Sequence, residues 1–186
     1  RGEKGISING LVWMGNAEEM LTRMESKLSA GYRCVKIKIG AIDFAAELNL
    51  LRILRQQYSK AEVELRLDAN GAFSPSEAME KLQQLAAFDI HSIEQPIRAG
   101  QWETMAELCR KSPIPIALDE ELIGIHTRQD KERLLDTIRP HYIILKPSLH
   151  GGFSGAEEWE ELADARGIAH WATSALESNV GLNAIA

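Results

Sequence analysis

Three carboxylates recur at nearly even spacing, each at the end of a short, mostly apolar run. Asp68 ends Leu-Arg-Leu-Asp, Glu94 ends Ser-Ile-Glu and Asp119 ends Ile-Ala-Leu-Asp. Any one of them alone would most simply be a solvated acid at the start of a loop. Gathered in one place they would repel one another unless a cation lay among them. Oxygen ligands from separate strands suit Mg²⁺, whereas zinc favours the histidine or cysteine that these positions lack.

Three lysines flank the carboxylates. Lys36 and Lys38 are two positions apart in Val-Lys-Ile-Lys-Ile, so both project from one face of an expected strand, and Lys146 ends a later run. The simpler interpretation is that these lysines extend into solvent from the strand ends, as most lysines do. Beside a divalent cation and a second ammonium, however, the pKa of a lysine falls from about 10.4 towards 7–8, where it can act as a base. This set predicts removal of a proton next to a substrate carboxylate, with the cation stabilising the resulting enediolate.

The elements that must position these residues alternate along the chain. Run ends from Lys38 to Lys146 lie 30, 26, 25 and 27 positions apart, which fits a strand, a crossover helix and two short loops. Capping signatures predict helices that begin after Asn16, Ser74 and Ser154. The expected strands are 6–12, 34–39, 63–68, 92–94, 116–119, 142–146 and 169–172.

This alternation predicts an α/β fold with parallel strands, either an open doubly wound sheet or a barrel. The expected strands alternate, with Val35 and Ile37 opposite the lysines, and are not continuously apolar, which favours a barrel with a polar mouth. No GxGxxG or GxxxxGK[ST] motif follows the first strand. We therefore predict a TIM-type (β/α)8 barrel. The 186 residues supply about seven βα units, so the eighth strand is expected to be absent from this chain.

Composition excludes several other classes of protein. With 21 basic and 27 acidic residues the net charge is −6, which argues against nucleic acid or an anionic membrane as a partner. The two cysteines lie far apart, and no apolar stretch approaches the roughly 18 residues of a membrane span. We expect a cytoplasmic enzyme that acts on a small-molecule carboxylate. The sequence is compatible with either a monomer or an oligomer.

Taken in order, these motifs resemble the barrel domain of the enolase superfamily. Lys-Ile-Lys, Asp-Ala-Asn, Ile-Glu-Gln-Pro, Asp-Glu and Lys146 carry the likeness, and the two-lysine pattern is similar to its muconate-lactonizing subgroup. Segments 9–15, 145–147 and 173–179 resemble the o-succinylbenzoate synthase family. The resemblance implies that residues 1–186 are an incomplete C-terminal catalytic barrel domain. It also implies an N-terminal α+β capping domain outside this sequence as the partner of that barrel.

The resemblance further implies the reaction and the residues that perform it. The family dehydrates 2-succinyl-6-hydroxy-2,4-cyclohexadiene-1-carboxylate to 2-succinylbenzoate in menaquinone biosynthesis. Asp68, Glu94 and Asp119 would bind Mg²⁺. Lys38 would remove the α-proton and return it to the departing hydroxyl in a syn elimination, while Lys146 would stabilise the enediolate from the opposite face.

Four more residues are implied to bind substrate. Lys36 would contact the substrate carboxylate and favour the neutral amine of Lys38, and Asn70 would lie beside the metal ligands. Ser174 and Glu177 would face the succinyl end of the substrate. For this last segment a Ser/Thr-rich loop that caps a helix at Asn179 is an equal alternative.

Other functions stay open at this point. An N-acylamino acid racemase or dipeptide epimerase would use Lys38 and Lys146 as a two-sided acid–base pair. A Schiff-base aldolase barrel, with Lys146 as nucleophile, would leave the three carboxylates unexplained. A noncatalytic barrel scaffold would have to bury these charged groups without a use for them, which costs stability.

Overall fold

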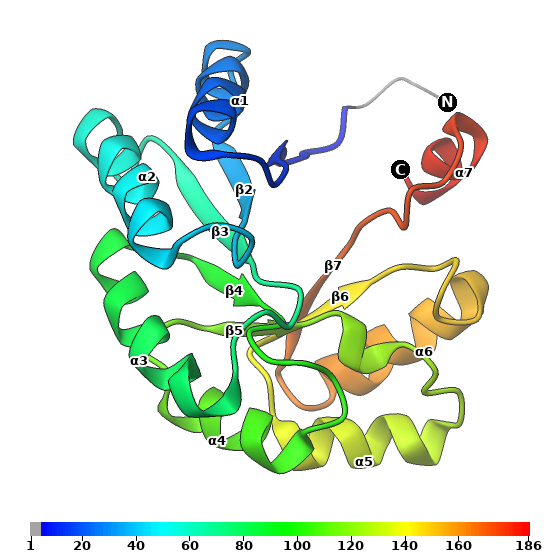
Figure 1. Ribbon diagram of the computed structural model, residues 1–186. Coiled ribbons are helices and arrows are strands. Elements are labelled where there is room, and N and C mark those ends of the chain that lie inside the picture. Colours follow the sequence, from blue (N-terminus) through cyan, green and yellow to red (C-terminus); the bar gives the residue numbers. More distant parts are fainter. Residues whose placement is uncertain (1–4) are drawn as a thin grey trace.

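The computed structural model describes residues 5–186 as a curved sheet with helices on its outer side (Figure 1). All neighbouring strands are parallel and lie in chain order, from β1 to β7. The strands are β1 (Gly10–Val12), β2 (Cys34–Lys38), β3 (Glu64–Asp68), β4 (Ser92–Glu94), β5 (Ile116–Leu118), β6 (Tyr142–Leu145) and β7 (Ala169–Ala172). The α-helices are α1 (Ala17–Ser29), α2 (Phe44–Gln57), α3 (Pro75–Leu85), α4 (Trp102–Lys111), α5 (Arg128–Ile138), α6 (Gly152–Asp164) and α7 (Asn179–Ile185). Two 3₁₀ helices, η1 (Ala86–Phe88) and η2 (Glu120–Leu122), complete the chain.

The seven βα units form a half-barrel, which confirms the predicted barrel architecture. Within residues 5–186 no ladder joins β1 to β7, so the arc stays open between them (Figure 1). No helix of this part of the chain is long and apolar enough to cross a membrane.

The core lies between the sheet and the helices. Val35 and Ile37 of β2 and Leu65 of β3 are buried towards the helices, where they join Leu51 and Leu54 of α2 in one apolar cluster. Burial of each such side chain contributes about 1.5–3 kcal/mol. The alternate positions turn inward, as the alternating pattern predicts.

Helix starts agree with the capping signatures at two of three positions. Asn16 caps α1 with a complete capping box, and α3 begins at Pro75, although the Ser74 side chain does not cap the backbone. The prediction for α6 was wrong. That helix begins at Gly152 after the left-handed Gly151 (φ +90°), so Ser154 already lies within its first turn.

Strand bounds also agree, with one large difference. The first strand covers only Gly10–Val12, and Ile6 and Ile8 are exposed where the sequence predicts pairing. Strands β5 and β6 end one residue before Asp119 and Lys146, so these two charged residues begin the following loops.

Candidate active site

The strand register places three of the predicted residues in one row. Lys38 of β2 is the register partner of Asp68 of β3, and Asp68 is the partner of Glu94 of β4. Asp119 and Lys146 follow the next two strands at the same edge of the sheet. In parallel barrels this C-terminal edge is where active sites lie.

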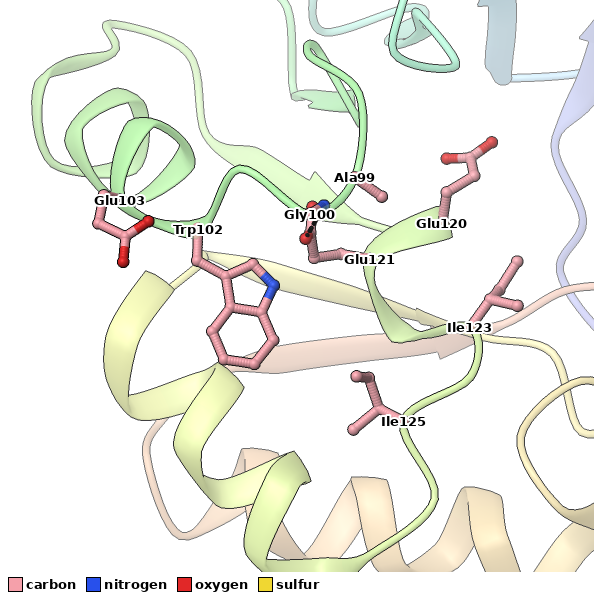
Figure 2. A pocket seen from close by; sticks show the side chains of 8 residues that line it. All are labelled: Ala99, Gly100, Trp102, Glu103, Glu120, Glu121, Ile123 and Ile125. Carbon is pink, nitrogen blue, oxygen red and sulfur yellow. Dashed lines mark hydrogen bonds between the residues drawn. The ribbon is translucent and has the colours of Figure 1, made fainter.

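A cavity of about 280 Å³ opens at this edge and brings most of the predicted site together. Six predicted residues line it: Lys36, Lys38, Asp68, Glu94, Lys146 and Ser174. Asn9, Leu11, Trp13, Thr173, Ala175 and Leu176 complete the lining. A second cavity of about 450 Å³, between the loop after β4 and η2, contains none of the predicted residues (Figure 2).

Lysine ammonium groups lie between the three buried carboxylates. Lys36 Nζ is 2.9 Å from Asp68 Oδ2 and 2.6 Å from Glu94 Oε2. Lys38 Nζ lies 2.6 Å from the same oxygen of Asp68, and Lys146 pairs with Asp119 across the loops that follow β5 and β6. Positive charge from two strands, β2 and the end of β6, therefore meets negative charge from three.

The donor set fits a hard divalent cation. Glu94 Oε1 and Asp119 Oδ1 are buried and have no hydrogen-bond partner among the described residues. Such oxygens are costly unless something satisfies them. In residues 5–186 no three acidic, histidine or cysteine side chains converge as a ligand cage. Lysine ammonium groups pair with the three carboxylates instead. A cation that displaced those ammonium groups would find three carboxylates, the ligands that Mg²⁺ prefers.

The charges shift the pKa values within the site in opposite directions. Burial raises the pKa of Glu94 well above its usual range, against the attraction of Lys36. Burial also opposes ionisation of Asp68, but Lys36 and Lys38 together hold its pKa below its usual value. Burial lowers the pKa of Lys36, and the pull of Glu94 and Asp68 outweighs it, so that pKa is raised. A bound cation would favour the ionised form of Glu94.

Asn70 connects the base position to its neighbours. Its side-chain oxygen accepts a hydrogen bond from Lys38 Nζ at 2.7 Å, and its Nδ2 donates to Glu120 Oε1 at 2.8 Å. Its backbone N–H donates to Asp68 Oδ1 at 3.1 Å, and its φ is +44°. The ring centroid of Trp13 lies 5.6 Å from Lys38 Nζ. The ammonium of Lys38 therefore has both a hydrogen-bond acceptor, Asn70, and an aromatic ring, Trp13, close to it.

The two residues predicted after β7 lie in different places. Ser174 lines the cavity, whereas Glu177 is not among the described residues that do so. The Glu177 carboxylate accepts hydrogen bonds from the Ser148 hydroxyl and from the Ala175 N–H, the latter at 2.6 Å. A helix does begin at Asn179, as the alternative for this segment predicts, but the Ser178 side chain does not cap its backbone.

The sequence analysis missed several residues that shape the site. Trp13 lines the cavity, Glu120 accepts a hydrogen bond from Asn70, and Gln95 and Glu121 connect the segments that follow Glu94 and Asp119. For Gln95, Glu120 and Glu121 the available signal was a polar residue directly after two of the three expected ligands, in Glu-Gln-Pro and Asp-Glu-Glu.

Comparisons with known proteins show a matching family and similar enzymes. Residues 19–186 match the family described as "Enolase C-terminal domain-like". The chain is 59% identical over 186 residues to o-succinylbenzoate synthase of Desulfotalea psychrophila, covering 100% of the chain and 50% of that protein. It is 30% identical over 177 residues to L-Ala-D/L-Glu epimerase of Bacillus subtilis, covering 94% of the chain and 47% of that protein.

A solved structure gives the same result. The crystal structure of MenC from Desulfotalea psychrophila superimposes with a TM-score of 0.92 at 56% identity, over 100% of this chain and 51% of that one. The chain thus spans about half the length of the relatives it matches.

Proposed function

Because the chain belongs to the enolase C-terminal domain-like family, as its motifs predict, we propose that it supplies the catalytic barrel of an o-succinylbenzoate synthase. The protein would dehydrate 2-succinyl-6-hydroxy-2,4-cyclohexadiene-1-carboxylate to 2-succinylbenzoate for menaquinone synthesis. The observation that carries the proposal is a cavity lined by lysines from β2 and from the end of β6, with buried carboxylates between them. The 59% identical relative of that name supports the choice of reaction.

Asp68, Glu94 and Asp119 would hold Mg²⁺. When bound, the ion would neutralise the negative charge that develops on the substrate carboxylate. Lys36, whose ammonium lies between Asp68 and Glu94, would then be free to contact the same carboxylate.

Lys38 would act as the base and then as the acid. Its neutral Nζ would take the proton from the carbon next to the carboxylate, and Asn70 would keep the amine aimed into the cavity. The electron pair of the broken C–H bond would first delocalise into the substrate carboxylate as an enediolate, and would then form the new ring double bond as the C–O bond breaks. The departing hydroxyl takes the proton from Lys38 and leaves as water. One base on one face serves both transfers, which makes the elimination syn.

Lys146 would act by charge from the other side of the cavity. Its ammonium, which lines the cavity and pairs with Asp119 when no cation is bound, would stabilise the electron-rich ring without transferring a proton. Ser174 at the cavity wall would contact the succinyl group. We also propose that an α+β domain in the remaining part of the protein closes the mouth, and that the enzyme acts in the cytoplasm.

An epimerase is the second candidate. Lysines on both sides of one α-carbon could exchange its proton between faces, and the 30% identical relative from Bacillus subtilis is named L-Ala-D/L-Glu epimerase. This reaction needs the same carboxylates and the same Lys38, with Lys146 as a second base.

One experiment separates the two. The intact protein with Mg²⁺ is incubated in deuterium oxide with the cyclohexadiene substrate, and separately with single-enantiomer N-acyl amino acids and L-Ala-L-Glu. We expect dehydration of the first substrate. Exchange of α-deuterium into the amino-acid substrates without any dehydration would overturn the proposal in favour of the epimerase.

A variant pair tests the base. Lys38→Ala should abolish turnover while product still binds, because the metal ligands and Lys146 are untouched. Lys111→Ala, on the exposed face of α4, is the matched control and should keep wild-type turnover. Turnover retained by Lys38→Ala would exclude Lys38 as the base.

A further inference from the structure

Gln95 is a buried glutamine whose hydrogen-bonding capacity is fully used. It follows Glu94 directly and adopts a left-handed backbone conformation with φ +39°. Its Oε1 accepts the backbone N–H groups of Asp119 and Glu121, both at 3.3 Å. Its Nε2 donates to Ile97 O and to Glu121 Oε2, both at 3.0 Å. Two lone pairs and two N–H groups are all that this amide offers.

The side-chain amide of Gln95 takes over where the backbone hydrogen bonds between β4 and β5 end. Strands β4 and β5 share only two register pairs, and their last backbone hydrogen bond runs from Gln95 N to Ala117 O at 2.9 Å. The N–H that would extend this ladder belongs to Asp119, directly after β5, and it donates to the side chain of Gln95 instead of to the backbone of β4. The amide therefore joins the residue after Glu94 to Asp119 itself.

Glu121 fixes which way this amide points. It is buried in η2, and its Oε1 accepts the N–H of Gly100 at 2.6 Å. Figure 2 shows the Glu121 side chain extending from η2 back to Gly100, in the wall of the second cavity. Because both carboxylate oxygens of Glu121 accept, the Gln95 group facing it must be the NH₂, which leaves the Gln95 oxygen for Asp119.

We propose that Gln95 and Glu121 act as positioning residues that set the separation of the Glu94 and Asp119 carboxylates and thereby the affinity of the site for a divalent cation. The inference rests on the proposed metal site. Mg²⁺ demands near-ideal octahedral geometry at about 2.0–2.1 Å, so small shifts of one strand end against the other weaken binding. Partners behind metal ligands typically affect metal affinity by about 10–100-fold.

We call the Gln95–Glu121 pair the clamp, and the test changes which of its groups donate and which accept hydrogen bonds. In Glu121→Gln one oxygen becomes an NH₂, so either Gly100 or Gln95 loses its acceptor, or the Gln95 amide turns and its NH₂ faces the N–H of Asp119. Gln95→Met removes all four hydrogen bonds at similar volume. The double variant Gln95→Glu with Glu121→Gln restores a donor–acceptor pair between the two positions, although it leaves Ile97 O without its donor. Glu158→Gln is the control, because it removes the charge of a half-buried carboxylate that pairs with Lys131 between α5 and α6.

Mg²⁺ affinity is measured by titration calorimetry on the intact protein, with thermal unfolding in EDTA as the measure of folding. We expect Glu121→Gln and Gln95→Met to bind Mg²⁺ about 10–100-fold more weakly, the double variant to recover part of that loss, and Glu158→Gln to bind as wild type. Affinity within about twofold of wild type for the folded clamp variants would overturn the clamp. Absence of Mg²⁺ binding by the wild-type protein would instead refute the metal assignment itself.

Discussion

Acidification is predicted to destabilise the protein through His150, which closes the loop after Lys146. The Nδ1 atom of the His150 ring accepts the backbone N–H of Lys146 at 3.2 Å. The backbone N–H of His150 donates to the Lys146 carbonyl at 3.1 Å. The side chain is only 3% exposed, and its ring lies 6.3 Å from that of Trp159. Since Nδ1 must be unprotonated to accept, the folded protein holds this ring neutral.

The magnitude follows from the pKa. Burial lowers the pKa of His150 from 6.5 to about 4. The unfolded chain therefore binds a proton on this histidine at a higher pH than the folded protein does. Its contribution to the free energy of unfolding is fully present above pH 6.5 and is lost as the pH falls from about 6.5 to 4. The loss is negligible at pH 7.5. It reaches about 2 kcal/mol at pH 5 and approaches about 3 kcal/mol near pH 4.

Urea unfolding of the intact protein at pH 7.5 and pH 5.0, followed by circular dichroism, measures this loss. His150→Gln is the comparison, because its side-chain oxygen can accept the Lys146 N–H without titrating. We expect the free energy of unfolding of the wild type to fall by about 2 kcal/mol more than that of the variant over this interval. Other titrating groups cancel in the difference. A difference below about 0.5 kcal/mol would refute a buried neutral His150 as the source.

Saturating Mg²⁺ should raise the Tm of the intact protein in differential scanning fluorimetry, and Asp119→Asn should remove that rise because one ligand oxygen is lost. A rise in Tm that the variant retains would count against Asp119 as a ligand. Gly155→Ala should lower both stability and turnover, because its Cβ would lie 1.8 Å from the carbonyl oxygen of His150 and displace the loop that carries Lys146; wild-type turnover in a steady-state assay would show that the loop tolerates the shift. Leu54→Ala in α2, fully buried, should cost about 2–5 kcal/mol in urea unfolding, and a cost under about 1 kcal/mol would mean that its surroundings collapse around the cavity.

The fold could be predicted because its signals are local and repeated. In β2, alternation of Val35 and Ile37 with lysines fixes which face meets the helices, and that pattern survives in the structure. The start of α6 could not be placed in this way. Gly151 turns the chain into the helix in a left-handed conformation, and Gly155 packs on the His150 carbonyl, so contacts between loop and helix override the signature at Ser154.

The site divides along the same line. Charged residues at strand ends could be predicted to meet, since parallel strands bring their C-terminal ends to one edge. The direction of a loop side chain could not. Glu177 turns to Ser148 and Gln95 reaches across to Asp119, and both are contacts between segments far apart in the chain.

The row formed by Lys38, Asp68 and Glu94 has a consequence for how such a barrel can change over time. Its alignment is set by the strand ladders beneath it, so the loops beyond can lengthen, shorten or be exchanged while the charged ends stay in place. One extra residue within β3, by contrast, would turn Asp68 to the helix side and bring an aliphatic side chain into the row. The strands can therefore keep the catalytic residues in place while the loops determine the substrate. New specificities can arise by exchange of loops without a change in the catalytic residues.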